Sequence, residues 1–267
     1  MKKFVWIVAA IGVLTVSAAE QKDSSEKVFR GAAGGRLTIE NVFGSINVTA
    51  VPGSTVRVAM TRTVEGRSAD DRAEAQREVS LETGEDGGNV WLKVKYPNNA
   101  CHCDRHYSVR YDFRVEAPPG MLLKLSTVTD GDVGVHGAFG DFDVNNVNGS
   151  IEMTDIAGSG QAHTVNGKVR VDFAKNPTGP SSFKSINGEL RVSFQPGLSA
   201  DVRLKTFNGE AWSDFDETLV PSDGGHWTGK MYARDRMTLA RIGSGGPEVS
   251  LDTLNGNIYI LNRGKKS

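Results

Sequence analysis

A short phrase, apolar-Asn-Gly-polar-apolar, returns along this chain and limits its fold more than any other feature. The glycines of the first four copies are 18, 21 and 21 residues apart. Asn-Gly accepts a positive φ more readily than other common pairs, so each copy predicts a sharp turn between extended segments. The pairs are Asn148-Gly149, Asn166-Gly167, Asn187-Gly188, Asn208-Gly209 and Asn255-Gly256.

A two-residue hairpin does not explain these turns, because residues beside such a loop lie opposite each other on one face. Val147 would then oppose Ser150, and Val165 would oppose Lys168. If Asn-Gly-x is a corner instead, the apolar residues on both sides of it can point into one core. Stacked coils with strands about 4.8 Å apart would align the corners. We therefore predict an all-β, repeat-built parallel β-solenoid, similar to a β-helix, with an antiparallel β-meander or sandwich as the alternative.

The chain has 267 residues and is predicted to divide into a signal peptide, a leader, one repeat domain and a short tail. Residues 1–19 are predicted to be a secretory signal peptide, since Lys2 and Lys3 precede a short apolar run and small residues. The run is short for a membrane span, and no transmembrane span is expected in the mature chain. Residues 20–35 are interpreted as a leader, residues 36–262 as the β-strand-repeat domain and residues 263–267 as a tail.

Within the domain, four segments differ in character. Residues 68–78, Ser-Ala-Asp-Asp-Arg-Ala-Glu-Ala-Gln-Arg-Glu, predict a short inserted helix with Ser68 as its cap and Asp70 and Asp71 in its first turn. Residues 98–106 form a loop rich in Cys and His. The repeat array is expected at 124–214, and the closing repeat at 230–262.

The loop holds the only concentrated chemistry in the sequence. Cys101 and Cys103 are the only cysteines, and His102 and His106 lie beside them. In an exported protein, oxidation of Cys101 and Cys103 to a disulfide is the ordinary outcome. Thiolate and imidazole ligands also suit zinc or copper, with Cys101, His102, Cys103 and His106 as the candidate ligands. A disulfide, free or intermolecular thiols, and a metal or redox site all remain open, and no cofactor is predicted.

The Asn-Gly pairs are predicted to be a structural turn ladder, in which asparagine side chains satisfy backbone groups and stack between coils. The Ser or Thr three residues before the glycine is expected to act similarly. No phosphate loop, Gly-x-Ser-x-Gly or His-Glu-x-x-His motif is present. The candidate carboxylates fall at unequal places in the repeat, so we predict that the protein is not an enzyme. They are Asp141, Asp143, Asp155 and Asp172.

The closing repeat carries a resemblance to a known family. Residues 241–247 read Arg-Ile-Gly-Ser-Gly-Gly-Pro, and residues 249–258 read Val-Ser-Leu-Asp-Thr-Leu-Asn-Gly-Asn-Ile. With Thr-Val-Asn-Gly at 164–167 and the predicted signal peptide, this resembles a large bacterial family whose β-strand-repeat domain has no known function and is named as a candidate adhesin. The resemblance covers roughly residues 36–262. It implies a β-repeat fold in the envelope or outside the cell, and transfers no catalytic residue.

The formal net charge of −1 shows no basic excess, so nucleic acid is not an expected partner. We predict an exported, non-catalytic, adhesin-like protein that binds to, or forms part of, the bacterial envelope or cell surface. It would lie in the periplasm or outside the cell, with an envelope glycan or another surface protein as its partner; its oligomeric state is left open. The alternatives are a carbohydrate-active enzyme on a β-helix and a metal or redox module at the Cys101/Cys103 loop.

Overall fold

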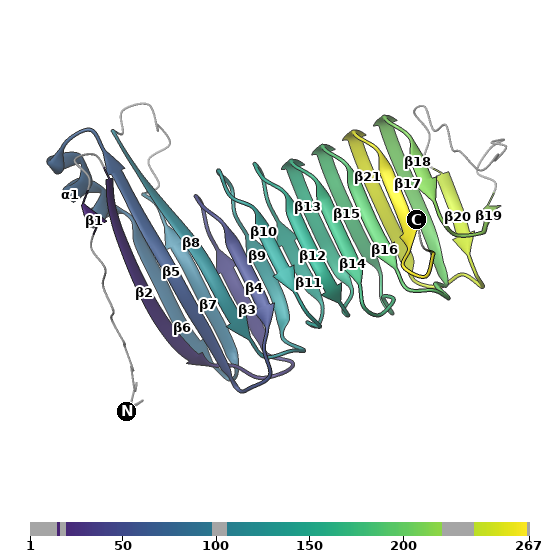
Figure 1. Ribbon diagram of the computed structural model, residues 1–267, viewed down its shortest axis with the longest axis horizontal. Coiled ribbons are helices and arrows are strands. Elements are labelled where there is room, and N and C mark those ends of the chain that lie inside the picture. The colour runs from purple at the N-terminus through teal and green to yellow at the C-terminus, as the bar shows by residue number, and fades with distance from the viewer. Residues whose placement is uncertain (1–14, 17–19, 98–105, 221–237, 266–267) are drawn as a thin grey trace.

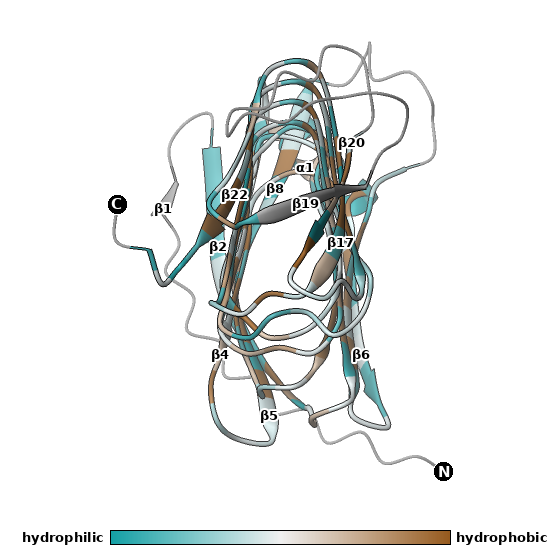
Figure 2. Cartoon of the chain, turned by 90° about the vertical axis from the view of Figure 1, so that its right-hand side faces the viewer, coloured by the Kyte–Doolittle hydropathy of each residue, from teal (hydrophilic) through white to brown (hydrophobic). Residues whose placement is uncertain are grey.

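The computed structural model describes residues 15–16, 20–97, 106–220 and 238–265. The chain forms an elongated all-β molecule in which two mixed sheets of eleven strands each lie face to face (Figures 1 and 2). The predicted all-β class and the single short helix are therefore confirmed for these residues. The sandwich-like arrangement of two sheets belongs to the alternative that the sequence left open.

We name the two layers sheet A and sheet B. From edge to edge, sheet A contains β1 (Thr15–Val16), β2 (Glu20–Arg30), β5 (Thr55–Gly66), β8 (Tyr107–Ala117), β4 (Ile46–Ala50), β10 (Val133–His136), β12 (Ile151–Ile156), β14 (Val169–Phe173), β16 (Leu190–Phe194), β22 (Ile258–Asn262) and β18 (Ala211–Ser213). Sheet B contains β19 (Glu217–Val220), β20 (Thr238–Ile242), β17 (Ala200–Asn208), β21 (Glu248–Asn255), β15 (Ser181–Asn187), β13 (Gly160–Asn166), β11 (Phe142–Asn145), β9 (Leu122–Ser126), β3 (Arg36–Glu40), β7 (Asn89–Lys95) and β6 (Ser80–Asp86).

In the centre of the molecule, consecutive strands alternate between the two sheets. From β9 to β14, each strand pairs in parallel with the strand two positions further along the chain. Equivalent positions of the repeat are in register, so that Val133, Ile151, Val169 and Leu190 form one row across sheet A. The repeat in the sequence is therefore a repeat of strand pairing in space.

The core lies between the two sheets and is formed by apolar residues that alternate with polar residues along each strand. In β14, Val169, Val171 and Phe173 are fully buried, whereas Arg170 and Asp172 face outward. Successive side chains of a strand point to opposite faces, so one apolar residue in two is enough to fill this interior. Aromatic rings continue the core, since Phe173 stacks on Phe194 with ring centroids 5.2 Å apart.

Sequence order and spatial order differ at both ends of the array. The closing repeat, β21 and β22, lies between β15/β16 and β17/β18, where its yellow strands stand among green ones (Figure 1). The first repeat, β3 and β4, likewise lies between β7/β8 and β9/β10. Beyond them the pairing turns antiparallel, in β2–β5–β8 and β6–β7 at one end and β17–β20–β19 at the other.

Within the segment 20–35, which the sequence suggested as a leader, Glu20–Arg30 form β2 and pair with β5, so these eleven residues belong to sheet A. Of the predicted signal peptide, only residues 15–16 are described, so the signal peptide stays a prediction. Within the described ranges, no helix is long and apolar enough to cross a membrane.

The helix α1 (Ala69–Glu78) begins at a capping box. Asp71 N donates to Ser68 Oγ at 3.1 Å, and Ser68 N donates to Asp71 Oδ2 at 2.8 Å. Ala75 is its only buried residue, and the helix lies against β5 and β8. The helix therefore lies against one end of sheet A, and nearly all of its surface faces solvent.

Candidate functional site

The five repeat asparagines meet along one corner of the array and bond to one another through their side chains. Their order in space is 148, 166, 187, 255 and 208, which follows the order of the strands. Each Nδ2 donates to the Oδ1 of its neighbour. The bonds are Asn166 to Asn148 and Asn187 to Asn166, both 2.8 Å, and Asn255 to Asn187 and Asn208 to Asn255, both 2.7 Å.

Next to this asparagine ladder, a row of buried hydroxyls holds the corner. Each hydroxyl donates to the carbonyl oxygen of the repeat glycine on the adjacent rung. The bonds are Thr164 to Gly149 at 2.8 Å, Ser185 to Gly167 at 2.8 Å, Thr253 to Gly188 at 3.0 Å and Thr206 to Gly256 at 2.9 Å. The corner thus satisfies its own polar groups.

The prediction that both apolar neighbours of Asn-Gly point into the core is wrong for the residue before the asparagine. Ile186 is 45% exposed and Phe207 is 48% exposed, whereas Leu190, on the far side of the turn, is fully buried. The reason is the hydroxyl row, since Ser185 occupies the inward position. Strand alternation then turns Ile186 outward.

The repeat glycines are required for a different reason from the one the sequence suggested. Gly149 has a φ of 158°, but Gly167, Gly188, Gly209 and Gly256 are not among the residues with positive φ. Instead, a Cβ at Gly188 would lie 1.9 Å from the Gly167 carbonyl oxygen. Close stacking of the rungs therefore demands glycine, because any side chain there would separate them.

The other predicted site residues do not form one site. Cys101, His102 and Cys103 lie outside the described residues, so the disulfide and metal hypotheses stay predictions; His106 is described and exposed. Among the described residues, no group of three His, Cys, Asp or Glu could hold a metal ion. The four candidate carboxylates are divided between the sheets. Asp155 and Asp172 lie at sheet A, whereas Asp141 and Asp143 lie at sheet B and line one hollow of about 590 Å³.

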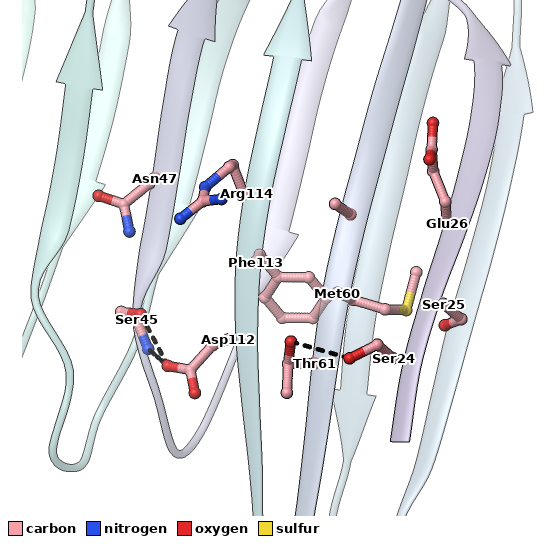
Figure 3. A pocket seen from close by; sticks show the side chains of 11 residues that line it. Ser24, Ser25, Glu26, Ser45, Asn47, Met60, Thr61, Asp112, Phe113 and Arg114 are labelled. Atoms are coloured by element: carbon pink, nitrogen blue, oxygen red, sulfur yellow. Dashed lines mark hydrogen bonds between the residues drawn. The ribbon is translucent and has the colours of Figure 1, made fainter. Parts of the chain in front are cut away.

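A pocket that the sequence did not reveal lies on the outer face of sheet A, over β2, β5, β8 and β4 (Figure 3). Its volume is about 400 Å³. One row of paired residues crosses it, namely Glu26, Ala59, Arg114 and Asn47 on four neighbouring strands. Because Ala59 has only a methyl group, the surface dips between the longer side chains on either side.

Asp112 on β8 is a fixed acceptor at one side of the pocket. Its Oδ1 accepts from Ser45 N at 2.9 Å and Ser45 Oγ at 2.7 Å, and its Oδ2 accepts from Arg110 Nε at 2.8 Å. Burial opposes its ionisation, but the bonds from Arg110 and Ser45 outweigh burial and lower the pKa of Asp112. Asp112 therefore stays a carboxylate at neutral pH and is a poor proton donor.

The hydrogen-bond donors that line the pocket have fewer partners within the protein than its carboxylate acceptors have. Within the described part of the chain, no ion pair or side-chain hydrogen bond engages the Arg114 guanidinium or the Asn47 amide, and both residues are exposed. The Ser24 and Thr61 hydroxyls lie 3.5 Å apart beside them. Both carboxylates lining the pocket face arginines, Asp112 with Arg110 and Glu26 with Arg57. The arrangement suits the binding of an oxygen-rich ligand and offers no free acid and base.

Sequence reasoning missed this pocket because three of its four strands, β2, β5 and β8, lie outside the repeats. Glu26, Ala59 and Arg114 come together through antiparallel pairing of β2, β5 and β8, and Asn47 joins them through parallel pairing of β4 with β8. No motif spans these four positions. The alternation in β5 and β8 predicts that Ala59 and Arg114 face outward, but not that they are neighbours.

No family model and no curated protein matches this sequence. Among solved structures, a candidate cell adhesion protein from Clostridium sporogenes ATCC 15579 is 10% identical, with a TM-score of 0.44 and coverage of 90% of this chain and 100% of that chain. A candidate adhesin from Bacteroides fragilis NCTC 9343 is 8% identical, with a TM-score of 0.38 and coverage of 90% and 96%. A candidate lipid binding protein from Parabacteroides distasonis ATCC 8503 is 9% identical, with a TM-score of 0.33 and coverage of 89% and 96%. The predicted resemblance to bacterial proteins named as adhesins is confirmed by these names.

Proposed function

We propose that this chain is an exported, non-catalytic protein that binds a component of the bacterial envelope or cell surface through the outer face of sheet A. The observation that carries the proposal is the pocket, where the unengaged Arg114 and Asn47 stand beside two hydroxyls on a rigid sheet. Polar groups held on strands keep their positions without a bound partner, so a ligand meets a site that is already ordered.

The scaffold supports this role, as a flattened parallel β-solenoid with antiparallel ends. Alternation of the strands between two sheets, in-register parallel pairing and the asparagine ladder are the features expected of stacked coils. Such an array presents long, flat outer faces whose side chains repeat from strand to strand. The repeat domain at 36–262, with β2 added to its sheet, would carry the binding face.

The enzymatic alternative finds less support. Carboxylates that cleave glycosidic bonds must flank one bond, with one of them able to donate a proton. Asp141 and Asp143 belong to the sheet opposite to that of Asp155 and Asp172, so the four cannot flank one bond. Asp141 and Asp143 line one hollow, but each accepts hydrogen bonds there, Asp141 from Ser159 N and Asp143 from Asn145 and Gln161. In the pocket, Asp112 is held ionised by three donors. Export to the periplasm or the cell exterior rests on the predicted signal peptide at 1–19.

The experiment that tests the proposal measures binding and turnover on the same samples. Mature protein (residues 20–267) is titrated onto purified sacculi and onto soluble envelope polysaccharides, and reducing ends are assayed after long incubation. We expect saturable binding without release of reducing ends, and at least a tenfold loss of affinity in Arg114→Gln. Arg170→Gln is the matched control, since Arg170 is exposed on the same face but pairs with Glu152 and Asp172.

Three outcomes would contradict the proposal. Release of reducing ends would make the protein an enzyme. Equal losses in Arg114→Gln and Arg170→Gln would mean that only the general charge of the face matters. Undiminished binding in Arg114→Gln would place the binding surface elsewhere. Circular dichroism and thermal unfolding of each variant check that the exposed substitutions leave the fold intact.

A further inference from the structure

The charges around the pocket leave one guanidinium without a partner. Next to the pocket, Arg57, Arg110 and Arg114 face outward on β5 and β8, close to the carboxylates of Glu26, Asp112 and Glu116. Arg57 forms ion pairs with two of these carboxylates, Glu26 at 3.4 Å and Glu116 at 3.7 Å. Arg110 takes the third, Asp112, at 2.8 Å. Because one arginine bridges two acids, Arg114 remains available in the middle of the pocket.

We infer that this pocket binds the carboxylate-bearing sugar of an acidic oligosaccharide, with Arg114 as its anchor; the inference rests on the proposed function and names its ligand. A guanidinium presents a planar fork of donors that matches a carboxylate in a bidentate pair. Arg110 and Arg57 cannot take this role without giving up the carboxylates that they already hold.

The neighbours of Arg114 fit the rest of a sugar. Asn47, which is paired with Arg114 in register, offers an amide that both donates and accepts. Ser24 and Thr61 offer hydroxyls 3.5 Å apart on the next row. Neutral groups of this kind can donate hydrogen bonds to sugar hydroxyls and can also accept hydrogen bonds from them. The pocket volume of about 400 Å³ lies in the range of small-ligand sites.

A second hollow extends the site beyond one sugar. Its volume is about 490 Å³, and it shares Ser45 and Asn47 with the first pocket. Its lining includes Gly131 and Gly149, which have no side chain, and also the Asp130 and Asp132 carboxylates beside Arg110. Asn47 therefore stands between two connected hollows. A ligand anchored at Arg114 by its acidic sugar can continue past Asn47 with a neutral sugar, whose hydroxyls can donate to the Asp130 and Asp132 carboxylates. This favours an oligosaccharide over a free sugar acid.

The test uses probes that separate charge from chain length. Titration calorimetry compares oligogalacturonate, oligomannuronate and hyaluronan fragments with a neutral malto-oligosaccharide of equal length and with free galacturonate. We expect at least one acidic oligosaccharide to bind at least tenfold tighter than the neutral chain and tighter than the free sugar acid. Binding should weaken as salt is raised.

Substitutions in the pocket then test whether Arg114 binds the carboxylate of the ligand. We expect Arg114→Gln to lower the affinity for the acidic chain at least tenfold and Arg114→Lys to lower it by a smaller factor, because an ammonium keeps the charge but lacks the planar fork. Asn47→Ala should reduce affinity for the oligosaccharide more than for free galacturonate. Arg170→Gln should leave affinity nearly unchanged.

The outcomes that overturn this inference differ from those that overturn the proposed function. Equal affinity for neutral and acidic chains, failure of every acidic probe, or indifference to Arg114→Gln would refute the acidic-sugar assignment. If sacculi or envelope polysaccharides still bound in those cases, the proposed function would stand with another ligand. If free galacturonate bound as tightly as its oligomer, the second hollow would have no part in binding.

Discussion

At each corner of the array, a single hydroxyl decides which neighbouring side chain reaches the core. Ser185 donates to the Gly167 carbonyl from the inward position of its strand, so Ile186 must face solvent and Leu190 fills the core beyond the turn. The sequence shows Ile and Leu on the two sides of Asn187-Gly188 as equals. The burial of one and the exposure of the other follow from the hydrogen bond of the residue that precedes them.

Alanine substitutions in this one repeat provide a matched pair. Leu190→Ala removes a fully buried side chain and should lower the free energy of unfolding by about 2–5 kcal/mol. Ile186→Ala removes a side chain that is 45% exposed and should cost about 1 kcal/mol or less. Urea unfolding of the two variants measures both values. Equal costs would show that Ile186 shares the core, as the sequence first suggested.

His163 should make the free energy of unfolding depend on pH. It lies half-buried on β13, where burial and then the positive charge of Lys184 lower its pKa, against a smaller opposing effect of Asp143. The unfolded chain therefore binds a proton near the ordinary pKa of 6.5, while the folded chain resists it. The free energy of unfolding should be constant with respect to this group above that pH, and should fall as the pH drops below it.

Substitution of His163 by glutamine tests this linkage. Between about pH 7.5 and about pH 5, the wild-type chain should lose more stability in urea than His163→Gln does. His136→Gln is the control, because His136 is an exposed histidine on the outer face of sheet A. Identical acid losses in wild type and His163→Gln would assign the acid sensitivity to other groups.

At the scale of elements, the repeat made some strands predictable and left others open. Four of the five Asn-Gly pairs marked where β13, β15, β17 and β21 end, because the residues that form each corner are adjacent in the sequence. The strand β2 was missed, since Glu20–Glu26 is polar and its pairing with β5 depends on a distant partner. The pocket was missed for the same reason. Where strands do not repeat, the register in which two of them pair depends on both strands and cannot be predicted from the sequence of either one alone.

The helix α1 is the element whose stability depends most on local contacts. Only Ala75 is buried, so tertiary packing contributes little and the capping box matters more than in a core helix. Ser68→Ala should lower the stability of the helix by about 1 kcal/mol and speed amide exchange within Ala69–Glu78, with little effect on the sheets. Hydrogen exchange by mass spectrometry measures both regions at once.

The neighbouring serine at the end of the helix is the control for this change. Ser80 begins β6 and is exposed, so Ser80→Ala should alter exchange in neither the helix nor the sheets. If Ser68→Ala left exchange in α1 unchanged, contacts with β5 and β8 would have to hold the helix without its cap. If it speeded exchange across both sheets, the helix would be part of the cooperative core.

For the whole molecule, the spatial order of the rungs carries information that sequence order does not. The closing repeat inserts between two rungs made earlier in the chain, so β17 and β18 contact the rest of the array through β21 and β22. The asparagine ladder passes through Asn255 on its way from Asn187 to Asn208. The long sequence gap between the last two Asn-Gly pairs is thus an excursion through β19 and β20 before the final rung is placed.

Removal of the closing repeat is the sharpest test of this arrangement. A chain ending at residue 247 loses β21 and β22, which leaves the facing edges of β15/β16 and β17/β18 without partners. We expect it to unfold at a markedly lower urea concentration than a chain lacking only residues 264–267, and a peptide of residues 248–267 added in trans should restore part of the difference. The repeats are alike, however, so β17 could move one rung and pair directly with β15. If the shortened chain were as stable as the full one, that shift would be the explanation, and the closing repeat would be an added rung and not a required one.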